Sequence, residues 1–181
     1  MQATSYDFSE RLIMSDGVNE SADVKTILMS NLPGARNVIR AHADNDRTGV
    51  DWWVEMASGA FLAVDTKIRE TDYSRQGKDD LALESWSVVE KNIHGWTRNP
   101  AKRTDYVLWL WKDTGRYCLI PFSPLCAVFG EKWQEWSRQY KTSKQHTPQA
   151  GGGYHSECVF VPRREVWSAI YRRLNGNIHG G

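Results

Sequence analysis

Two aspartates and a lysine lie within residues 49–69, and together they could bind a divalent cation. Asp51 lies at the start of an aromatic run, residues 50–54, and Asp65 and Lys67 follow a second apolar run. Side chains two residues apart on a strand leave the same face, so Asp65 and Lys67 should lie side by side. Two carboxylates in one place repel each other unless a cation lies between them, and Mg²⁺ prefers such oxygen ligands. A lysine beside the cation could orient an attacking water or stabilise charge on a phosphate oxygen, which is the chemistry of phosphodiester hydrolysis.

A β-hairpin is the element that would position these three residues. Residues 50–54 and 60–64 are rich in strand formers, and Ala57-Ser58-Gly59 between them is a turn signal. An edge hairpin that ends in a solvated Asp–Lys pair would explain the same letters without any chemistry.

The order of Asp51, a spacer and Asp65-x-Lys67 resembles the PD-(D/E)xK nuclease superfamily, whose restriction enzymes, Holliday-junction resolvases and repair nucleases place these groups on a β-hairpin. Asp51 lies 14 residues before Asp65, and Val50 stands where the motif has proline. The resemblance covers residues 21–120. It implies a restriction-endonuclease-like core and a nuclease that uses Mg²⁺ or Mn²⁺ to cut DNA. Asp51, Asp65 and the Thr66 carbonyl would be metal ligands, and Lys67 would lie beside the attacking water.

Further carboxylates are candidates for the same site. Glu84 lies in the middle of a predicted strand, residues 81–89, and a buried glutamate there would need a partner. We expect this strand to lie next to the hairpin and Glu84 to be an auxiliary catalytic residue, although an edge-exposed side chain is the alternative. Glu20 and Asp23 could lend a carboxylate from the preceding helix, or could interact only with the positive end of the helix dipole.

Basic side chains in three polar segments are candidates for contact with nucleic acid. The net charge is only +1, so a nuclease would have to concentrate its positive charge locally. The candidates are Arg69, Arg75, Lys78, Lys102, Arg103 and Lys144. Four acids within residues 69–80 would cancel part of this attraction, so a solvated loop is an equal alternative there.

The spacing of apolar residues predicts an α/β or α+β fold, with a central mixed sheet of about five strands flanked by helices. A chain of 181 residues with nine tryptophans can bury about 70% of its unfolded surface. We predict an N-terminal arm over residues 1–20 and a single nuclease-like domain over 21–181. Helices are expected near 21–29, 124–140 and 163–174, the second interrupted or bent near Gly130, and a flexible loop is expected over 141–155.

The cysteines and the apolar runs indicate the cellular compartment of the protein. Three widely spaced cysteines favour free thiols in a reducing compartment. The first twenty residues are polar, and no apolar run reaches 18 residues, so we expect a cytoplasmic protein that does not bind membranes.

The leading hypothesis is therefore a Mg²⁺-dependent or Mn²⁺-dependent nuclease acting on DNA. The alternative is a catalytically silent protein with the same scaffold that binds nucleic acid or another protein without cutting. The sequence leaves open the form of the substrate, endonucleolytic or exonucleolytic cleavage, one or two metals, and whether the chain forms a homodimer.

Overall fold

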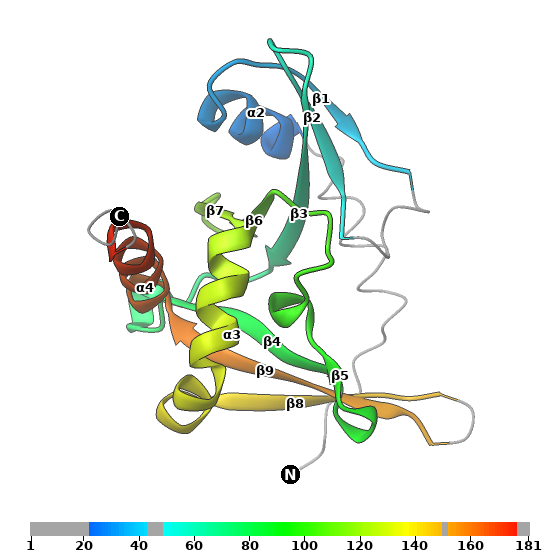
Figure 1. The fold of residues 1–181 in the computed structure, drawn as a ribbon, viewed down its shortest axis with the longest axis vertical. Coiled ribbons are helices and arrows are strands. Elements are labelled where there is room, and N and C mark those ends of the chain that lie inside the picture. The colour runs from blue at the N-terminus through cyan, green and yellow to red at the C-terminus, as the bar shows by residue number, and fades with distance from the viewer. Residues whose placement is uncertain (1–21, 43–48, 150–151, 177–181) are drawn as a thin grey trace. The chain divides into compact units, whose positions relative to one another are not determined.

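The computed structural model describes residues 22–42, 49–149 and 152–176 (Figure 1). These residues belong to two compact units, Met1–Glu70 with Arg103–Leu119, and Thr71–Lys102 with Ile120–Gly181. This division shows which residues pack most closely with one another. It does not test the single domain over residues 21–181, which stays a prediction. The predicted N-terminal arm lies outside the described residues.

The first unit contains a mixed sheet with one helix against it. The strands run in the order β1-β2-β3-β6-β7. β1 pairs antiparallel with β2, β2 antiparallel with β3, and β3 parallel with β6. The elements are α2 (Ala22–Asn31), β1 (Ala35–Arg40), β2 (Trp52–Met56), β3 (Phe61–Arg69), β6 (Tyr106–Trp111) and β7 (Tyr117–Pro121). The chain passes into the second unit within β7.

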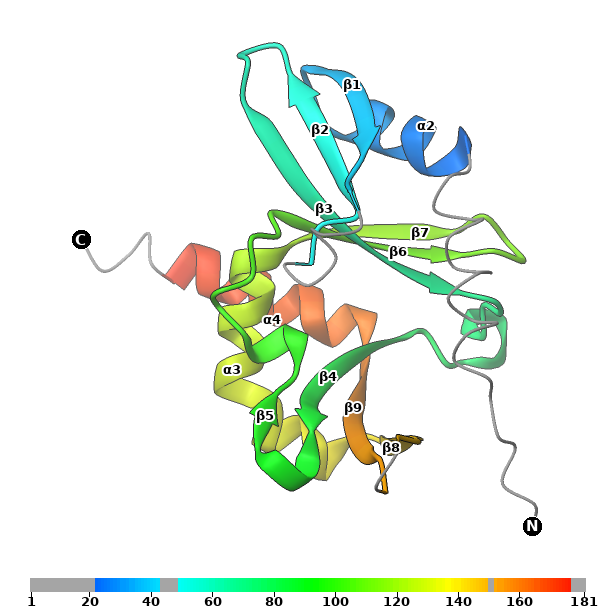
Figure 2. The same ribbon diagram turned by 90° about the vertical axis from the view of Figure 1, so that its right-hand side faces the viewer.

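Helix α2 lies beside the strands of this sheet (Figure 2), and it packs on them through residues one turn apart. Val24 and Leu28 are fully buried against Val54 of β2 and Val64 of β3. Side chains alternate between the two faces of a strand, so the even-numbered residues of β3 face α2 and the odd-numbered residues face the opposite side. This alternation decides which face carries the candidate site.

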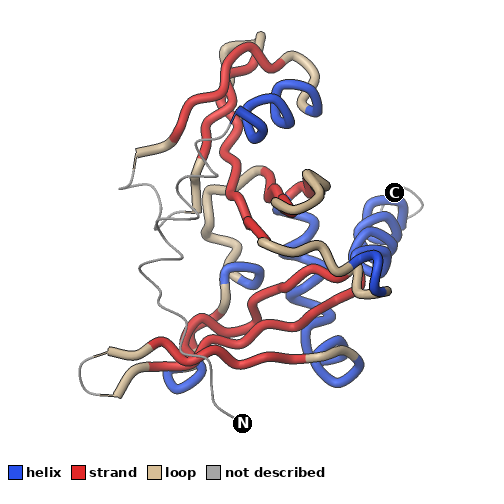
Figure 3. Tube along the Cα trace, turned by 180° about the vertical axis from the view of Figure 1, so that it is seen from behind, coloured by secondary structure: helices blue, strands red, loops and turns tan. Residues whose placement is uncertain are grey.

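The second unit contains an antiparallel sheet and two longer helices (Figure 3). The strand order is β5-β4-β9-β8, and every pair is antiparallel. The elements are β4 (Asp80–Val88), β5 (Ile93–His94), α3 (Phe122–Gln139), β8 (Thr142–Thr147), β9 (Tyr154–Pro162) and α4 (Arg163–Gly176), with 3-10 turns η2 (Ser74–Gln76), η3 (Val89–Lys91) and η4 (Trp96–Arg98). α3 and α4 contact each other and β9.

The α+β class and the mixed five-stranded sheet confirm the prediction from apolar spacing. Three expectations were wrong. Strand β4 does not join the sheet of the hairpin, because it pairs with β5 and β9 in the second sheet. Residues 142–147 form strand β8 instead of a loop. Helix α3 runs unbroken through Gly130, since apolar residues on either side of the glycine bury one continuous face and outweigh its cost of about 1 kcal/mol.

None of the described helices is long and apolar enough to cross a membrane.

Candidate functional site

Strand β3 positions Asp65 and Lys67 on the face opposite α2. Val64 and Ile68 contribute to the core beneath α2, so the odd-numbered residues point the other way. Asp65 is only 3% exposed, and its Oδ1 lies 2.7 Å from the Lys67 Nζ. The Lys67 side chain is 29% exposed. The structure thus brings the buried carboxylate and the lysine together, in an ion pair that reaches solvent on the lysine side.

Asp51 lies one residue before the start of β2. Its backbone N–H donates to the Val64 carbonyl at 2.9 Å, and its carbonyl accepts from the Ala41 N–H at 2.8 Å. Its Oδ2 accepts the Thr66 backbone N–H at 2.7 Å and the Thr66 hydroxyl at 2.5 Å. Because β2 starts only at Trp52, the Asp51 carboxylate takes the place of a strand partner for the Thr66 N–H.

The Thr66 carbonyl points to the same edge of β3 as Asp51. The carbonyls of Ala63 and Arg69 accept hydrogen bonds from Asp105 and Lys112 on the β6 side, whereas the Val64 carbonyl accepts from Asp51. Backbone groups alternate sides along a strand, so those of the next even-numbered residue also face the β2 side. The structure therefore places a carboxylate and a directed carbonyl at one edge of β3.

Two contacts lie next to each other at Thr66. Asp51 contacts Thr66, and Asp65 contacts Lys67. The Thr66 side chain shares its parity with Val64 and Ile68, and so it lies on the α2 side, while Asp65 leaves the opposite face. A cation touching both carboxylates would have to lie along the edge of β3 between them.

The donor set suits a hard cation such as Mg²⁺. Carboxylate and carbonyl oxygens are its preferred ligands, and it is commonly held by only one or two carboxylates together with waters and substrate phosphates. Within residues 22–42, 49–149 and 152–176 no group of three or more His, Cys, Asp or Glu side chains could hold a metal ion. Asp51, Asp65 and the Thr66 carbonyl offer oxygen donors of the kind that Mg²⁺ prefers, and a metal site among them stays a prediction.

Glu84 lies on β4 in the second unit, and its carboxylate has local partners. Its Oε2 accepts from the Ser87 hydroxyl at 2.8 Å and from the Trp96 N–H at 2.9 Å. A Cβ atom built on Gly95 would lie 2.2 Å from the Glu84 carbonyl oxygen. Glu84 therefore organises the turn between β4 and η4, and its part in the catalytic site stays a prediction.

The candidate nucleic-acid contacts are distributed over both units. Arg69 and Arg103 belong to the first unit, and the other four belong to the second: Arg75, Lys78, Lys102 and Lys144. All are exposed except Lys102, which is half-buried. The charge of Lys144 is partly offset because its Nζ lies 3.9 Å from Glu157.

Of the two candidate carboxylates at the N-terminal helix, only Asp23 lies among the described residues. Asp23 is exposed in the first turn of α2, where it suits the positive end of the helix. Glu20 lies outside the described residues.

Asp105 is a supporting residue that the sequence pattern did not identify. Its Oδ2 accepts the Ala63 N–H at 2.7 Å on the β6 edge of β3, which mirrors what Asp51 does on the β2 edge. Each aspartate immediately precedes the first residue of a strand, Trp52 or Tyr106. An aspartate one residue before an apolar strand is the signal that could have found both.

Comparisons of this chain with protein-family models, curated proteins and solved structures found no match.

Proposed function

We propose that this protein is a metal-dependent phosphodiesterase that cleaves DNA, with Asp51, Asp65 and Lys67 at its centre. The observation that carries the proposal is the buried Asp65 carboxylate, which lies 2.7 Å from the Lys67 ammonium, directly beside the peptide that Asp51 binds. A charge buried to this degree costs free energy unless it is compensated, and such groups concentrate at functional sites.

Each residue has a separate task in this proposal. Asp51 is fixed by backbone hydrogen bonds on both sides, and with Oδ2 bound to Thr66 its Oδ1 is the oxygen that a cation would take. Lys67 holds its side-chain nitrogen at the solvent edge of the pair, where it can donate a hydrogen bond to an attacking water or to a phosphate oxygen. A bound Mg²⁺ or Mn²⁺ would supply Lewis-acid stabilisation of the charge on the phosphate.

DNA is the proposed partner because the chemistry requires a phosphodiester, and exposed arginines and lysines lie in both units. Arg69 ends the strand that carries Asp65 and Lys67, and its side chain is exposed. A guanidinium there could contact a phosphate next to the one that is cut.

A second candidate is a protein that binds nucleic acid or another protein without cutting. The observation in its favour is that the described residues hold no cluster of three metal-ligating side chains. Two carboxylates held by Thr66 and Lys67 could also serve only to fix the edge of β3.

Incubation of the full chain with single-stranded, duplex and branched DNA and with RNA, in Mn²⁺ or in EDTA, separates these candidates. We expect cleavage that requires the metal and is lost in Asp51→Asn and Asp65→Asn. Asp113→Asn removes an exposed carboxylate from the β6–β7 turn and is the matched control, which should cleave normally. Undiminished cleavage by Asp65→Asn would refute the site, and binding without cleavage of any substrate would favour the second candidate.

A further inference from the structure

Two histidines lie opposite each other on the β8–β9 hairpin in the second unit. His146 of β8 is the register partner of His155 of β9, and their ring centroids lie 4.9 Å apart. The Phe160 N–H donates to the Lys141 carbonyl, and pairs with and without mutual backbone hydrogen bonds alternate along an antiparallel ladder. His146 and His155 therefore form a pair without mutual backbone hydrogen bonds, which is the kind that brings side chains closest together.

Glu90 of η3 fixes the orientation of His155. The His155 backbone N–H points away from β8 and donates to both Glu90 carboxylate oxygens, at 3.0 and 3.2 Å. The His155 Nδ1 lies 2.5 Å from Glu90 Oε1. Because an ionised carboxylate can only accept a hydrogen bond, Nδ1 carries the proton, and in the neutral ring Nε2 keeps the lone pair.

The turn that closes the hairpin fixes His146. Its Nε2 lies 3.2 Å from the Gly152 carbonyl oxygen, so Nε2 donates this bond and Nδ1 keeps the lone pair in the neutral ring. A Cβ atom built on Gly153 would lie 2.7 Å from the same Nε2 and 2.4 Å from the Thr147 carbonyl oxygen. The close approach of the turn to His146 therefore requires glycine at position 153.

We propose that His146 and His155 bind one borderline divalent cation such as Zn²⁺, through His146 Nδ1 and His155 Nε2, with Glu90 as the residue that positions His155. Imidazole nitrogen suits Zn²⁺, and a histidine ligand usually donates its other N–H to a carboxylate or a backbone carbonyl. Both rings have such a partner. Two imidazoles on one tetrahedral Zn²⁺, at about 2.0–2.1 Å per nitrogen, have centroids roughly 5 Å apart.

This site goes beyond the proposed function, because it uses nitrogen ligands and a different class of cation. Among the described residues no group of three or more His, Cys, Asp or Glu side chains could hold a metal ion. The proposed site has two protein ligands, since Glu90 is bonded to His155. Water or a donor group of a bound molecule would complete the coordination shell.

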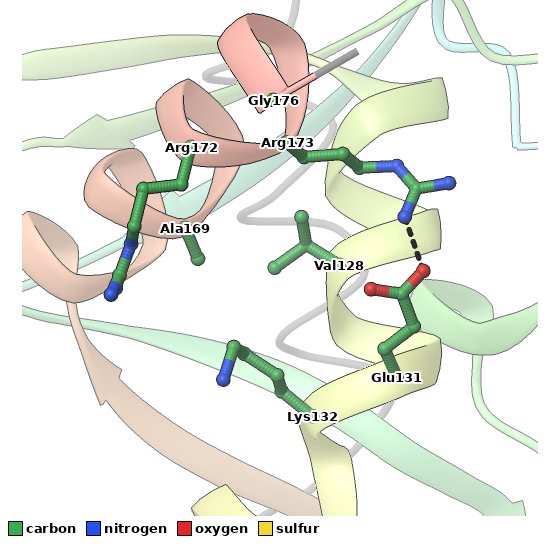
Figure 4. Close-up of a pocket in the computed structure, with 7 residues that line it drawn as sticks. All are labelled: Val128, Glu131, Lys132, Ala169, Arg172, Arg173 and Gly176. Atoms are coloured by element: carbon green, nitrogen blue, oxygen red, sulfur yellow. Dashed lines mark hydrogen bonds and ion pairs between the residues drawn. The ribbon is translucent and has the colours of Figure 1, made fainter. Parts of the chain in front are cut away.

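The charges nearby favour the histidines over the cleft between α3 and α4 as a place for a cation. Lys144 lies two residues before His146 on the same face, and its charge is partly offset by Glu157, 3.9 Å away. In the cleft, by contrast, Figure 4 shows the one carboxylate of the described lining joined to an arginine. The charged residues of that lining are Glu131, Lys132, Arg172 and Arg173.

Calorimetric titration of the full chain with Zn²⁺ at mildly alkaline pH tests the inference, because only neutral imidazole binds a metal. We expect the wild type to bind Zn²⁺ and His146→Gln and His155→Gln each to lose that binding. Glu90→Gln should weaken it about 10- to 100-fold. His94→Gln removes an exposed histidine from β5, the other edge strand of the same sheet, and is the matched control, which should bind normally.

Long-range ¹H–¹⁵N spectra of the imidazoles identify the nitrogens that bind Zn²⁺ and verify that each variant is folded. Zn²⁺ should shift the signals of His155 Nε2 and His146 Nδ1. Without metal, Glu90→Gln should lower the share of the Nδ1–H tautomer at His155 and leave His146 unchanged. A merely structural role of Glu90 would not move the proton between the two nitrogens.

Four results would overturn the inference. They are a wild type that binds no Zn²⁺, undiminished binding by folded His146→Gln or His155→Gln, Zn²⁺ shifts at other nitrogens, and Glu90→Gln that binds like the wild type. The proposed function fails separately, because Mn²⁺ has the lowest affinity of these metals for such ligands. A chain that binds Zn²⁺ as described but never cleaves DNA with Mn²⁺ keeps this inference and loses the nuclease. Cleavage with Mn²⁺ by a chain that binds no Zn²⁺ does the reverse.

Discussion

Replacing Lys67 with methionine removes the cation from a buried ion pair and leaves the carboxylate behind. The two charges lie 2.7 Å apart, which at an effective dielectric constant of about 20 corresponds to roughly 6 kcal/mol of gross attraction. Desolvation of both groups and solvent screening at the 29% exposed lysine offset most of that. Because Asp65 itself is only 3% exposed, we expect Lys67→Met to lower the free energy of unfolding by about 2–3 kcal/mol.

Urea unfolding in EDTA at neutral pH measures this cost, and a double-mutant cycle isolates the pair. Asp65→Asn should cost about 1 kcal/mol, since the lysine that remains can be hydrated. The double variant should be less destabilised than the sum of the single ones, which gives a coupling of about 1–2 kcal/mol. Lys91→Met, which removes an exposed charge, is the control and should change stability by less than about 0.5 kcal/mol. A Lys67→Met protein as stable as the wild type, with no coupling to Asp65, would refute the ion pair described here.

Three further predictions concern the second unit. Gly95→Ala should destabilise the protein by about 1–3 kcal/mol, because its Cβ would lie 2.2 Å from a backbone carbonyl oxygen of β4. Gly130→Ala should stabilise it by roughly 0.5–1 kcal/mol, because the added Cβ would meet no atom within 4 Å outside its chain neighbours and its own helix backbone. Thermal unfolding of the two variants checks both signs. Hydrogen bonds from the backbone N–H and the side chain of His155 lower the pKa of Glu90 to about 2 from its ordinary 4.5. The stability from this contact is therefore present above pH 4.5 and is lost as the pH falls toward 2, so the difference in Tm between wild type and Glu90→Gln should shrink across that window. Arg98→Lys should cost about 1–2 kcal/mol in urea unfolding, since the guanidinium carbon lies 4.5 and 3.9 Å from the centroids of two tryptophan rings, and an unchanged midpoint would show that this stacking contributes nothing.

The parts of the site that the sequence predicted depend on local geometry. Asp65 and Lys67 are two residues apart on a strand of strong β-formers, so alternation alone places them together. The hairpin follows from two apolar runs and a short turn, and Ser58-Gly59 occupies that turn in the structure. Helix α4 likewise follows from apolar spacing, with Val166 and Ile170 buried.

The parts that the sequence did not predict depend on which strands pair. Alternation marks residues 80–88 as a strand but does not say whether β4 joins the hairpin or β9, because long-range pairing is set by the packing of whole elements. β8 is polar and largely exposed, so only its backbone pairing with β9 reveals it as a strand. The bond between Asp51 and the Thr66 hydroxyl depends on where β2 begins, and strand ends are not fixed by residue type.

Titration of the full chain with Mn²⁺, followed by electron paramagnetic resonance of the free ion, measures most directly whether Asp51 and Asp65 share a cation. We expect the wild type to take up Mn²⁺, and Asp51→Asn and Asp65→Asn each to lose that binding, while Asp113→Asn keeps it. Uptake that survives unchanged in either of the first two variants, or a wild type that takes up no Mn²⁺, would contradict a metal site at the edge of β3.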